Sequence, residues 1–543
     1  MPSGIFVQHA IDIRRFTWIR RLASDYASNH SALASFFAGD PASPASWSDA
    51  IARRQASRPP SRFVDVLGAQ QESRGAPAEA RAAAETLRQP EAVAVVTGQQ
   101  AGLFGGPLFT LLKALTTIQL AKRVSREQSI PVVAVFWIDA EDHDWDEVAS
   151  CAVLDPNCQV QRVTLHPPTG AGHVPVGSLI IGEDVGTALN ALAEALPPSE
   201  FTASLIGDLR RTYQSGRGMA EAFGRWLESV LGPHGLVVFD SCDPAAKPFV
   251  RGLFEQELRS MRTSALATEA GERLTAQGYH AQVTPHREST ALFRLDGTRQ
   301  PIRRTADGFS VSNTPTTLDD LLAALKRHPE QFSPNVLLRP LVQDTLFPTV
   351  CYVSGPNELA YLAQLKTVYE DFELPMPLIH PRDSATLLDS VGARFLNRQD
   401  IPFEALQPQD EAALNQLLEA QLPASVEQSI DDARRAIQAY LGRVVEVVPT
   451  VDPTLAGAAR STLGRMEHSL KTLHNKILQA AKRRDDTLRR QFAHTRAQAF
   501  PEGHPQERAL GFVGFLNRFG PDLVDRLLSD LPLDPKHHIL ITP

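Results

Sequence analysis

Residues Val95–Leu115 read VVTGQQAGLFGGPLFTLLKAL and pass from an apolar run, through a glycine-rich loop, into a helical pattern. Backbone N–H groups at the N-terminus of a helix suit an anion, so this junction predicts a phosphate or carboxylate site. The glycine spacing matches neither G-x-G-x-x-G nor a P-loop. A tight strand-to-helix turn, which needs glycine for backbone reasons alone, is the alternative interpretation. The glycines concerned are Gly98, Gly102, Gly105 and Gly106.

Two glutamines in the loop favour a ligand site over a plain turn. The side-chain amides of Gln99 and Gln100 can both donate and accept hydrogen bonds, which a turn does not require. Capture of an anion would explain the glycines and their position together. We therefore expect the loop from Thr97 to Gly106 to bind part of a substrate or a nucleotide.

Apolar runs on both sides of the loop predict the fold class. PVVAVFWI (Pro131–Ile138) and GLVVFD (Gly235–Asp240) lack polar alternation, as is typical of parallel strands buried on both faces. Strand, glycine turn, helix and strand begin a doubly wound α/β domain, in which ligands bind beyond the carboxyl ends of the strands. We expect this core to span residues 1–385, with insertions at about 150–231 and 260–335.

The C-terminal third carries a heptad repeat in two segments, separated by Pro449 and Pro453. The repeat predicts two long helices packed as an antiparallel coiled coil over residues 386–500, and a tail over 501–543 that packs back on the core. The coiled coil is either a dimer contact or an intramolecular strut. The apolar positions are Val426, Ile430, Ala433, Ile437, Tyr440 and Val444 in the first segment, and Ala459, Leu463, Met466, Leu470, Leu473, Ile477 and Ala480 in the second.

The overall composition is that of a soluble globular protein. Of the 543 residues 43% are hydrophobic, and the net charge of −8 argues against a general nucleic-acid binder. Neither a signal peptide nor an apolar run of roughly 18 residues is found, so no membrane span is expected. The four cysteines form no C-x-x-C pair. A zinc ribbon or a disulfide framework is therefore unexpected, and a reduced, cytoplasmic protein is the simplest interpretation.

A run of acidic residues follows the second apolar run directly. DAEDHDWDE (Asp139–Glu147) places six carboxylates and one histidine at the carboxyl end of a predicted strand. Such charges repel unless water, a cation or a basic partner compensates them. We expect Asp142, His143 or Asp144 to act as a general base, or the acids to hold Mg²⁺ near a phosphorylated substrate. A solvated acidic loop is the alternative, and no spacing typical of a zinc site is present.

A third candidate region runs from Asn335 to Leu365 and reads NVLLRPLVQDTLFPTVCYVSGPNELAYLAQL. Arg339 is suited to clamp a carboxylate or phosphate, because its guanidinium donates in a fork. A structural ion pair between Arg339 and Asp344 is equally compatible with the sequence. The stretch SGPNE is a second strand-to-helix junction, and its candidate binding residues are Ser354, Gly355 and Glu358.

These stretches together resemble the cysteine ligase family of bacillithiol biosynthesis, the cysteine-adding enzyme BshC. VVTGQQAGLFGGPLFTLLKA, VVAVFWIDAEDHDWDEV, LLRPLVQDTLFPTVCYVSGPNELAYLAQL and the tail FPEGHPQERALGFVGFLNRFGPDLVDRLL carry the resemblance, in order along the chain. It implies a Rossmann-like core with connecting-peptide insertions, a long antiparallel coiled coil and a homodimer. It further implies addition of cysteine to the amino group of glucosaminyl-malate, which yields bacillithiol.

The same family is likened to class I aminoacyl-tRNA synthetases, but this sequence contains neither H-x-G-H nor Lys-Met-Ser-Lys-Ser. A free carboxylate does not condense with an amine in water without activation, so ATP and Mg²⁺ are expected cofactors. Two other function classes stay open. One is a metal-assisted hydrolase or phosphoesterase that uses the Asp139–Glu147 loop, and the other is a dimeric binding protein without catalysis.

Overall fold

The computed structural model describes residues 9–286, 288–420, 424–484 and 486–543. The chain folds into two compact units. The first unit joins the chain up to Leu387 with Gln506–Pro543, and the second comprises Leu388–Pro505. The C-terminal segment thus folds with the N-terminal unit.

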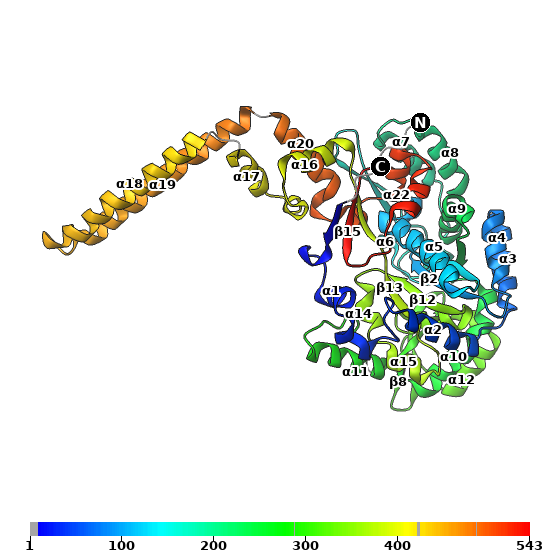
Figure 1. Cartoon of the computed structure of the whole chain (residues 1–543). Helices are drawn as coiled ribbons and strands as arrows, with labels where there is room; N and C mark the ends of the chain where they lie inside the picture. The colour runs from blue at the N-terminus through cyan, green and yellow to red at the C-terminus, as the bar shows by residue number, and fades with distance from the viewer. Residues whose placement is uncertain (1–8, 287, 421–423, 485) are drawn as a thin grey trace. The chain divides into compact units, whose positions relative to one another are not determined.

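A five-stranded parallel sheet lies at the centre of the first unit (Figure 1). Its order is β13-β12-β2-β3-β6, so the chain moves outward in opposite directions on the two sides of β2. The point of reversal lies between β2 and β12, which is where ligands bind in doubly wound sheets. The predicted apolar runs are confirmed as strands. The strands are β2 (Val93–Gln99), β3 (Val132–Ile138), β6 (Val237–Asp240), β12 (Thr349–Ser354) and β13 (Leu378–Pro381).

Hydrophobic cores on both faces explain why these strands show no polar alternation. Along β2, Val93 and Val95 belong to one core, whereas Ala94 and Val96 belong to the other. Helix α5 (Leu108–Gln128) packs on β2 and β3 within the first core. The remaining core helices are α1 (Arg21–Ser28), α2 (Pro44–Ala56), α3 (Phe63–Arg74), α4 (Ala78–Thr86), α6 (Trp145–Val148), α10 (Lys247–Ser260), α13 (Arg339–Leu346), α14 (Glu358–Leu362) and α15 (Lys366–Asp371).

The two segments predicted as insertions carry additional structure. Residues 150–231 contain an antiparallel hairpin followed by three helices, of which the last packs against β6. Residues 260–335 contain two helices and an antiparallel sheet of order β10-β9-β8-β7-β11. The elements are β4 (Ser150–Leu154), β5 (Val160–Thr164), α7 (Val185–Ala195), α8 (Thr202–Thr212), α9 (Met219–Leu231), α11 (Thr263–Ala276), β7 (Ser289–Asp296), β8 (Thr298–Thr305), β9 (Gly308–Val311), β10 (Thr314–Thr316), α12 (Leu318–Arg327) and β11 (Phe332–Pro334).

The C-terminal segment is tied to the core by a small sheet of order β1-β15-β14. Strand β15 pairs parallel with β14 and antiparallel with the N-terminal strand β1, so both ends of the described chain join one sheet. The elements are β1 (His9–Asp12), β14 (Ser384–Leu387), α21 (Gln506–Ala509), α22 (Phe512–Phe519), α23 (Leu523–Asp530) and β15 (His537–Ile541).

The second unit contains a hairpin of two long helices, α18 (Ala424–Val447) and α19 (Leu455–Arg484), which pack side by side (Figure 1). The antiparallel pairing within one chain is therefore confirmed. The other helices of this unit are α16 (Ser390–Gln399), α17 (Ala412–Ala420) and α20 (Asp486–Ala499). Among the described helices, none is both long and apolar enough to cross a lipid bilayer.

Five of the apolar positions predicted to face the partner helix are exposed, namely Ala480 and four larger side chains. Tyr440 is 68% exposed, and Val444, Met466 and Leu473 are 44%, 44% and 50% exposed. Polar pairs join the two helices instead, since Gln438 donates to Glu467 and His474 contacts Glu427. A helix repeats every 3.6 residues and a heptad every 3.5, so a sequence pattern alone does not fix which positions face the partner helix.

Candidate functional site

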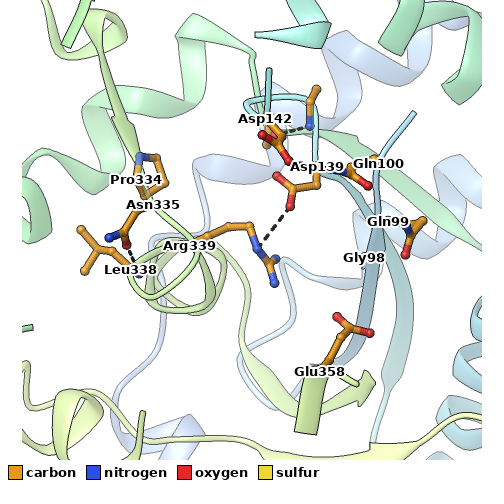
Figure 2. A network of polar contacts seen from close by, with 12 residues as sticks. Gly98, Gln99, Gln100, Asp139, Asp142, Pro334, Asn335, Leu338, Arg339 and Glu358 are labelled. Atoms are coloured by element: carbon orange, nitrogen blue, oxygen red, sulfur yellow. Dashed lines mark hydrogen bonds and ion pairs between the residues drawn. The ribbon is translucent and has the colours of Figure 1, made fainter. Parts of the chain in front are cut away.

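The carboxyl ends of β2, β3 and β12 bring the predicted stretches together. The parallel register pairs Gln99 with Ile138 and Thr97 with Val353, so the chain leaves all three strands at the same edge of the sheet. Arg339 of α13 and Glu358 of α14 lie there (Figure 2), and Lys113 of α5 forms an ion pair with Glu358. We call this group the switch-point cluster, which comprises Lys113, Asp139, Arg339, Tyr352, Glu358 and Tyr361.

Lys113 is a buried lysine of α5 at the centre of the cluster. Its Nζ lies 2.5 Å from Glu358 Oε2 and donates to the carbonyl oxygen of Gly98 (2.7 Å) and to Gln99 Oε1 (3.3 Å). Burial lowers the pKa of Lys113, and Glu358 opposes that shift. This residue was missed from the sequence, although a single lysine inside the apolar LLKAL segment is the signal that could have identified it.

Glu358 is held as an anion by several donors. Its carboxylate accepts from the backbone N–H of Gly355 (2.6 Å) and from the hydroxyls of Tyr352 (2.9 Å) and Tyr361 (3.3 Å). Although burial opposes ionisation, Lys113 and the Gly355 N–H lower the pKa of Glu358. Ser354 is fully buried beside this group, and its hydroxyl has no hydrogen-bond partner among the described residues.

Arg339 reaches toward the end of β3 from the first turn of α13 (Figure 2). Its Nε lies 3.4 Å from Asp139 Oδ2, and its Nη2 donates to the hydroxyl of Tyr361 over 3.0 Å. The side chain is only 9% exposed, yet Nη1 has no hydrogen-bond partner in the described part of the chain. A buried guanidinium with an unused N–H is equipped to bind an oxyanion.

The alternative ion pair between Arg339 and Asp344 is not formed. Positions five apart on a helix differ in direction by about 140°, so the two side chains point apart on α13. Asp344 instead accepts hydrogen bonds from the Tyr369 hydroxyl (2.5 Å) and from Gln343 (3.0 Å). The structure therefore places Asp344 outside the switch-point cluster.

Asp139 is the carboxylate of the switch-point cluster whose pKa is raised. Burial raises the pKa of Asp139, while Arg339 holds it down. Its backbone N–H donates to the carbonyl oxygen of Gln99 (2.9 Å), which links the ends of β2 and β3. A carboxylate that binds protons more readily than usual accepts a proton from an ammonium group more readily as well.

The three predicted catalytic residues lie in the loop after β3 and play different parts. Asp142 accepts from the Gln100 side chain (2.8 Å) and the His143 N–H (2.7 Å), and these bonds lower the pKa of Asp142 although burial opposes them. Asp144 accepts from the Glu147 N–H (3.3 Å) and caps α6. His143 is half exposed. All three line a cavity of about 470 Å³ with Trp145, Asp146, Pro167, Ala171 and Gly172.

Arg299, from β8 of the second insertion, joins this loop and was missed from the sequence. Its Nη1 lies 3.4 Å from His143 Nδ1 and 3.7 Å from Asp142 Oδ1, and its Nη2 donates to the Pro334 carbonyl oxygen (2.8 Å). Arg299 also stacks on Phe293 at 4.0 Å. The sequence offered no signal, because Arg299 lies about 155 residues beyond the loop it contacts.

The glycine loop is used differently from the prediction. The N–H groups of Gly102, Gly105 and Gly106 donate to carbonyl oxygens within the loop, so these amides do not form an anion cradle. Gly105 adopts φ +102°, and a Cβ there would overlap the ring of Phe512. The Thr97 hydroxyl donates to the Val353 carbonyl oxygen (2.8 Å) between strands. These residues serve packing.

The side chains of Gln99 and Gln100 are the parts of the loop that point toward the charged groups, since they bond to Lys113 and Asp142. Gly98 contributes its carbonyl oxygen to Lys113. No group of three or more histidine, cysteine or acidic side chains that could hold a metal ion is present among the described residues.

Comparison with known proteins gives matches along nearly the whole chain. The sequence model described as "Bacillithiol biosynthesis BshC, N-terminal Rossmann-like domain" matches residues 9–383. The one described as "Bacillithiol biosynthesis BshC, C-terminal coiled-coil domain" matches residues 385–542.

Several curated relatives carry the name "Putative cysteine ligase BshC". The relative from Salinibacter ruber is 35% identical over 529 residues, which cover 95% of each chain. That from Koribacter versatilis is 33% identical over 527 residues, covering 96% of this chain and 97% of the relative. That from Chlorobaculum tepidum is 32% identical over 469 residues, covering 82% of each. With both domain models matched in order, and with relatives this similar over most of their length, the chain belongs to the BshC family of bacillithiol biosynthesis enzymes.

Proposed function

We propose that this protein is a ligase that joins cysteine to the amino group of glucosaminyl-malate and so forms the amide of bacillithiol. The names of its relatives support the reaction class. The observation in the structure that carries the proposal is the buried, unused Nη1 of Arg339 at the switch point. A dicarboxylate such as the malate group is a suitable anion for that N–H group.

Activation of the cysteine carboxylate by ATP with Mg²⁺ is part of the proposal. Buried cations at the end of a parallel sheet suit phosphate oxygens, which is what Arg339 and Lys113 offer. The described residues contain no three-ligand metal group, so Mg²⁺ would rely on phosphate oxygens and on one acid such as Asp142. Bound ATP would activate the cysteine carboxylate, and the phosphate or nucleotide group placed on it would leave as the amine forms the amide.

Among the acids and the histidine near the cavity, His143 and Asp139 are the proposed bases for the attacking ammonium. Asp144 is engaged as a helix cap, and the pKa of Asp142 is lowered by its donors. His143→Ala or Asp139→Asn is expected to reduce turnover by roughly 10²-fold or more if that residue takes the proton. Asp146→Asn in the same cavity serves as the control. Wild-type turnover in a folded variant would exclude the residue concerned.

The decisive experiment is reconstitution. The purified protein is incubated with cysteine, glucosaminyl-malate, ATP and Mg²⁺, and bacillithiol is sought by mass spectrometry with each component omitted in turn. Product that requires all components supports the ligase. Divalent-cation-dependent hydrolysis of a phosphoester without amide formation would favour the hydrolase that uses the acidic cavity.

A homodimer through the helical hairpin is the proposed assembly. Tyr440, Val444, Met466 and Leu473 are apolar and exposed on α18 and α19, and a second copy would cover them. Replacement of Met466 and Leu473 by Glu is expected to yield a monomer in light scattering, whereas wild type elutes as a dimer. A wild-type monomer at micromolar concentration would refute the assembly. We place the reaction in the cytoplasm, where the four cysteines of the chain would stay reduced.

A further inference from the structure

The C-terminal segment carries an arginine to the N-terminus of α5, and its backbone is fixed there from both sides. The Gln506 side chain exchanges two hydrogen bonds of 2.8 Å with the backbone of Leu387. Further along, Leu108 N–H donates to the Leu510 carbonyl oxygen (2.8 Å), and Phe512 N–H donates to that of Gly106 (3.2 Å). The short helix α21 between these anchors is therefore held against the glycine loop.

Two guanidinium groups share the ring of Phe109 at this place. The guanidinium carbon of Arg382 lies 5.7 Å from the ring centre, and that of Arg508, on α21, lies 5.6 Å from it. Arg382 is buried and forms a bidentate pair with Glu507 (2.7 and 2.9 Å). Arg508 is exposed, so solvent and ligands can reach it.

Charge balance singles out Arg508 among the cations around the switch point. Within the described residues, Lys113, Arg339 and Arg382 each have a carboxylate closer than 4 Å. The side chain of Arg508 forms neither an ion pair nor a hydrogen bond there. The pairs are Lys113–Glu358 (2.5 Å), Arg339–Asp139 (3.4 Å) and Arg382–Glu507 (2.7 Å).

The electrostatic surroundings connect Arg508 to both parts of the site. Although the side chain as a whole is exposed, desolvation by the atoms around its guanidinium and the like charge of Arg382 lower the pKa of Arg508, while Glu507, Glu147 and Glu358 oppose that shift. Glu147 ends the acidic run after β3, and Glu358 is the carboxylate of the switch-point cluster. A guanidinium keeps its proton at neutral pH, so Arg508 is a positive charge that carboxylates of both regions attract, although none of the described ones contacts it directly.

We propose that Arg508 binds an oxyanion of the substrate that occupies the switch-point cluster, as a second anion contact beside Arg339. Its planar fork fits a carboxylate or a phosphate, and the bound anion would relieve the repulsion between two guanidinium groups on one ring. The inference rests on the proposed function in one respect, namely that an anionic substrate binds at this site. With this contact the C-terminal segment is part of the substrate site, and α21 takes part in substrate binding as well as in packing.

The test is calorimetric titration of the full chain with three probes, namely L-malate, glucosaminyl-malate and ATP with Mg²⁺. Arg508→Gln is compared with wild type and with Arg518→Gln. Arg518 is the matched control, because it is an exposed arginine of the same segment that stacks on Phe519 at 5.5 Å. Arg508→Lys keeps the charge and removes the fork. Circular dichroism melting verifies that each variant is folded.

We expect Arg508→Gln to reduce the affinity for one probe by roughly tenfold or more. Arg508→Lys should reduce that affinity less, and Arg518→Gln should leave it unchanged. Loss confined to the two malate compounds identifies a carboxylate, and loss confined to ATP identifies a phosphate. Unchanged affinity of Arg508→Gln for every probe that wild type binds would overturn this inference and leave the proposed function intact. Wild type that binds none of the probes would overturn both.

Discussion

The glycine loop and the switch-point cluster both begin at the carboxyl end of β2, yet their polar groups are in opposite states. In the loop, the amides of Gly102, Gly105 and Gly106 are satisfied by neighbouring carbonyl oxygens, and Phe512 fills the space that a side chain would need. In the cluster Arg339 Nη1, and beside it Ser354 Oγ, are buried without a partner among the described residues.

This difference indicates which part of a glycine-rich junction is equipped to bind a ligand. A buried polar group without a partner costs free energy, so a protein retains one where a ligand supplies the missing bond. A satisfied and filled loop offers no such place. We therefore expect changes in the loop to act on stability and changes in the cluster to act on binding.

The largest effect is expected from Gly105→Ala in the loop. The new Cβ would overlap the Phe512 ring and would sit at φ +102°, so strain and overpacking together should cost about 3–5 kcal/mol of unfolding free energy. Urea denaturation followed by circular dichroism measures the loss. Gly216→Ala is the control, because Gly216 has φ +83° with no atom near its Cβ and should cost only about 1 kcal/mol. Equal losses would show that packing against Phe512 is unimportant.

The next effect concerns the buried pair within the cluster. Lys113→Met leaves Glu358 buried and uncompensated, which should cost about 3 kcal/mol. The double variant Lys113→Met with Glu358→Gln should regain part of that loss, since no unpaired charge remains. Thermal melting of the wild type, the two single variants and the double variant measures the loss of stability in each. Additive losses would mean that the two residues act independently and would weaken the distinction between cluster and loop.

Arg339→Met should leave most of the stability intact and reduce substrate affinity or kcat/KM by roughly 10²-fold. Asp344→Asn is the comparison, because Asp344 lies on the same helix but outside the cluster. It should alter melting and leave affinity unchanged. Equal loss of affinity in both variants would contradict the assignment of Arg339 to the ligand.

The smallest effect is a pH dependence that originates at Asp139. Burial raises its folded-state pKa above that of the unfolded chain, so its stabilising contribution is complete below the unfolded pKa of about 3.9 and is lost as pH rises through the folded pKa. Asp139→Asn should flatten this decline in urea titrations at successive pH values. Arg339→Met should extend the decline to higher pH, because Arg339 opposes the shift. An unchanged profile in both variants would place Asp139 in an ordinary, solvated environment.

The sequence alone determined the fold class and indicated the stretches that carry the candidate site. Runs such as Pro131–Ile138 predict parallel strands, because a strand buried on both faces needs no polar alternation. In doubly wound sheets ligands bind at the strand ends, so the stretches at Gln99, Asp139 and Ser354 could be assigned to one edge. The heptads likewise predicted the helical hairpin.

Only the tertiary structure decided the partners. Strand order places Arg339 against Asp139 rather than Asp344, and an insertion brings Arg299 to Asp142 and His143. Phe512 fills the space beside Gly105, so a loop with the composition of an anion site became a packing element. The physical reason is that periodicity and backbone preference act over a few residues, whereas ion pairs, steric exclusion and the satisfaction of buried polar groups depend on distance in space.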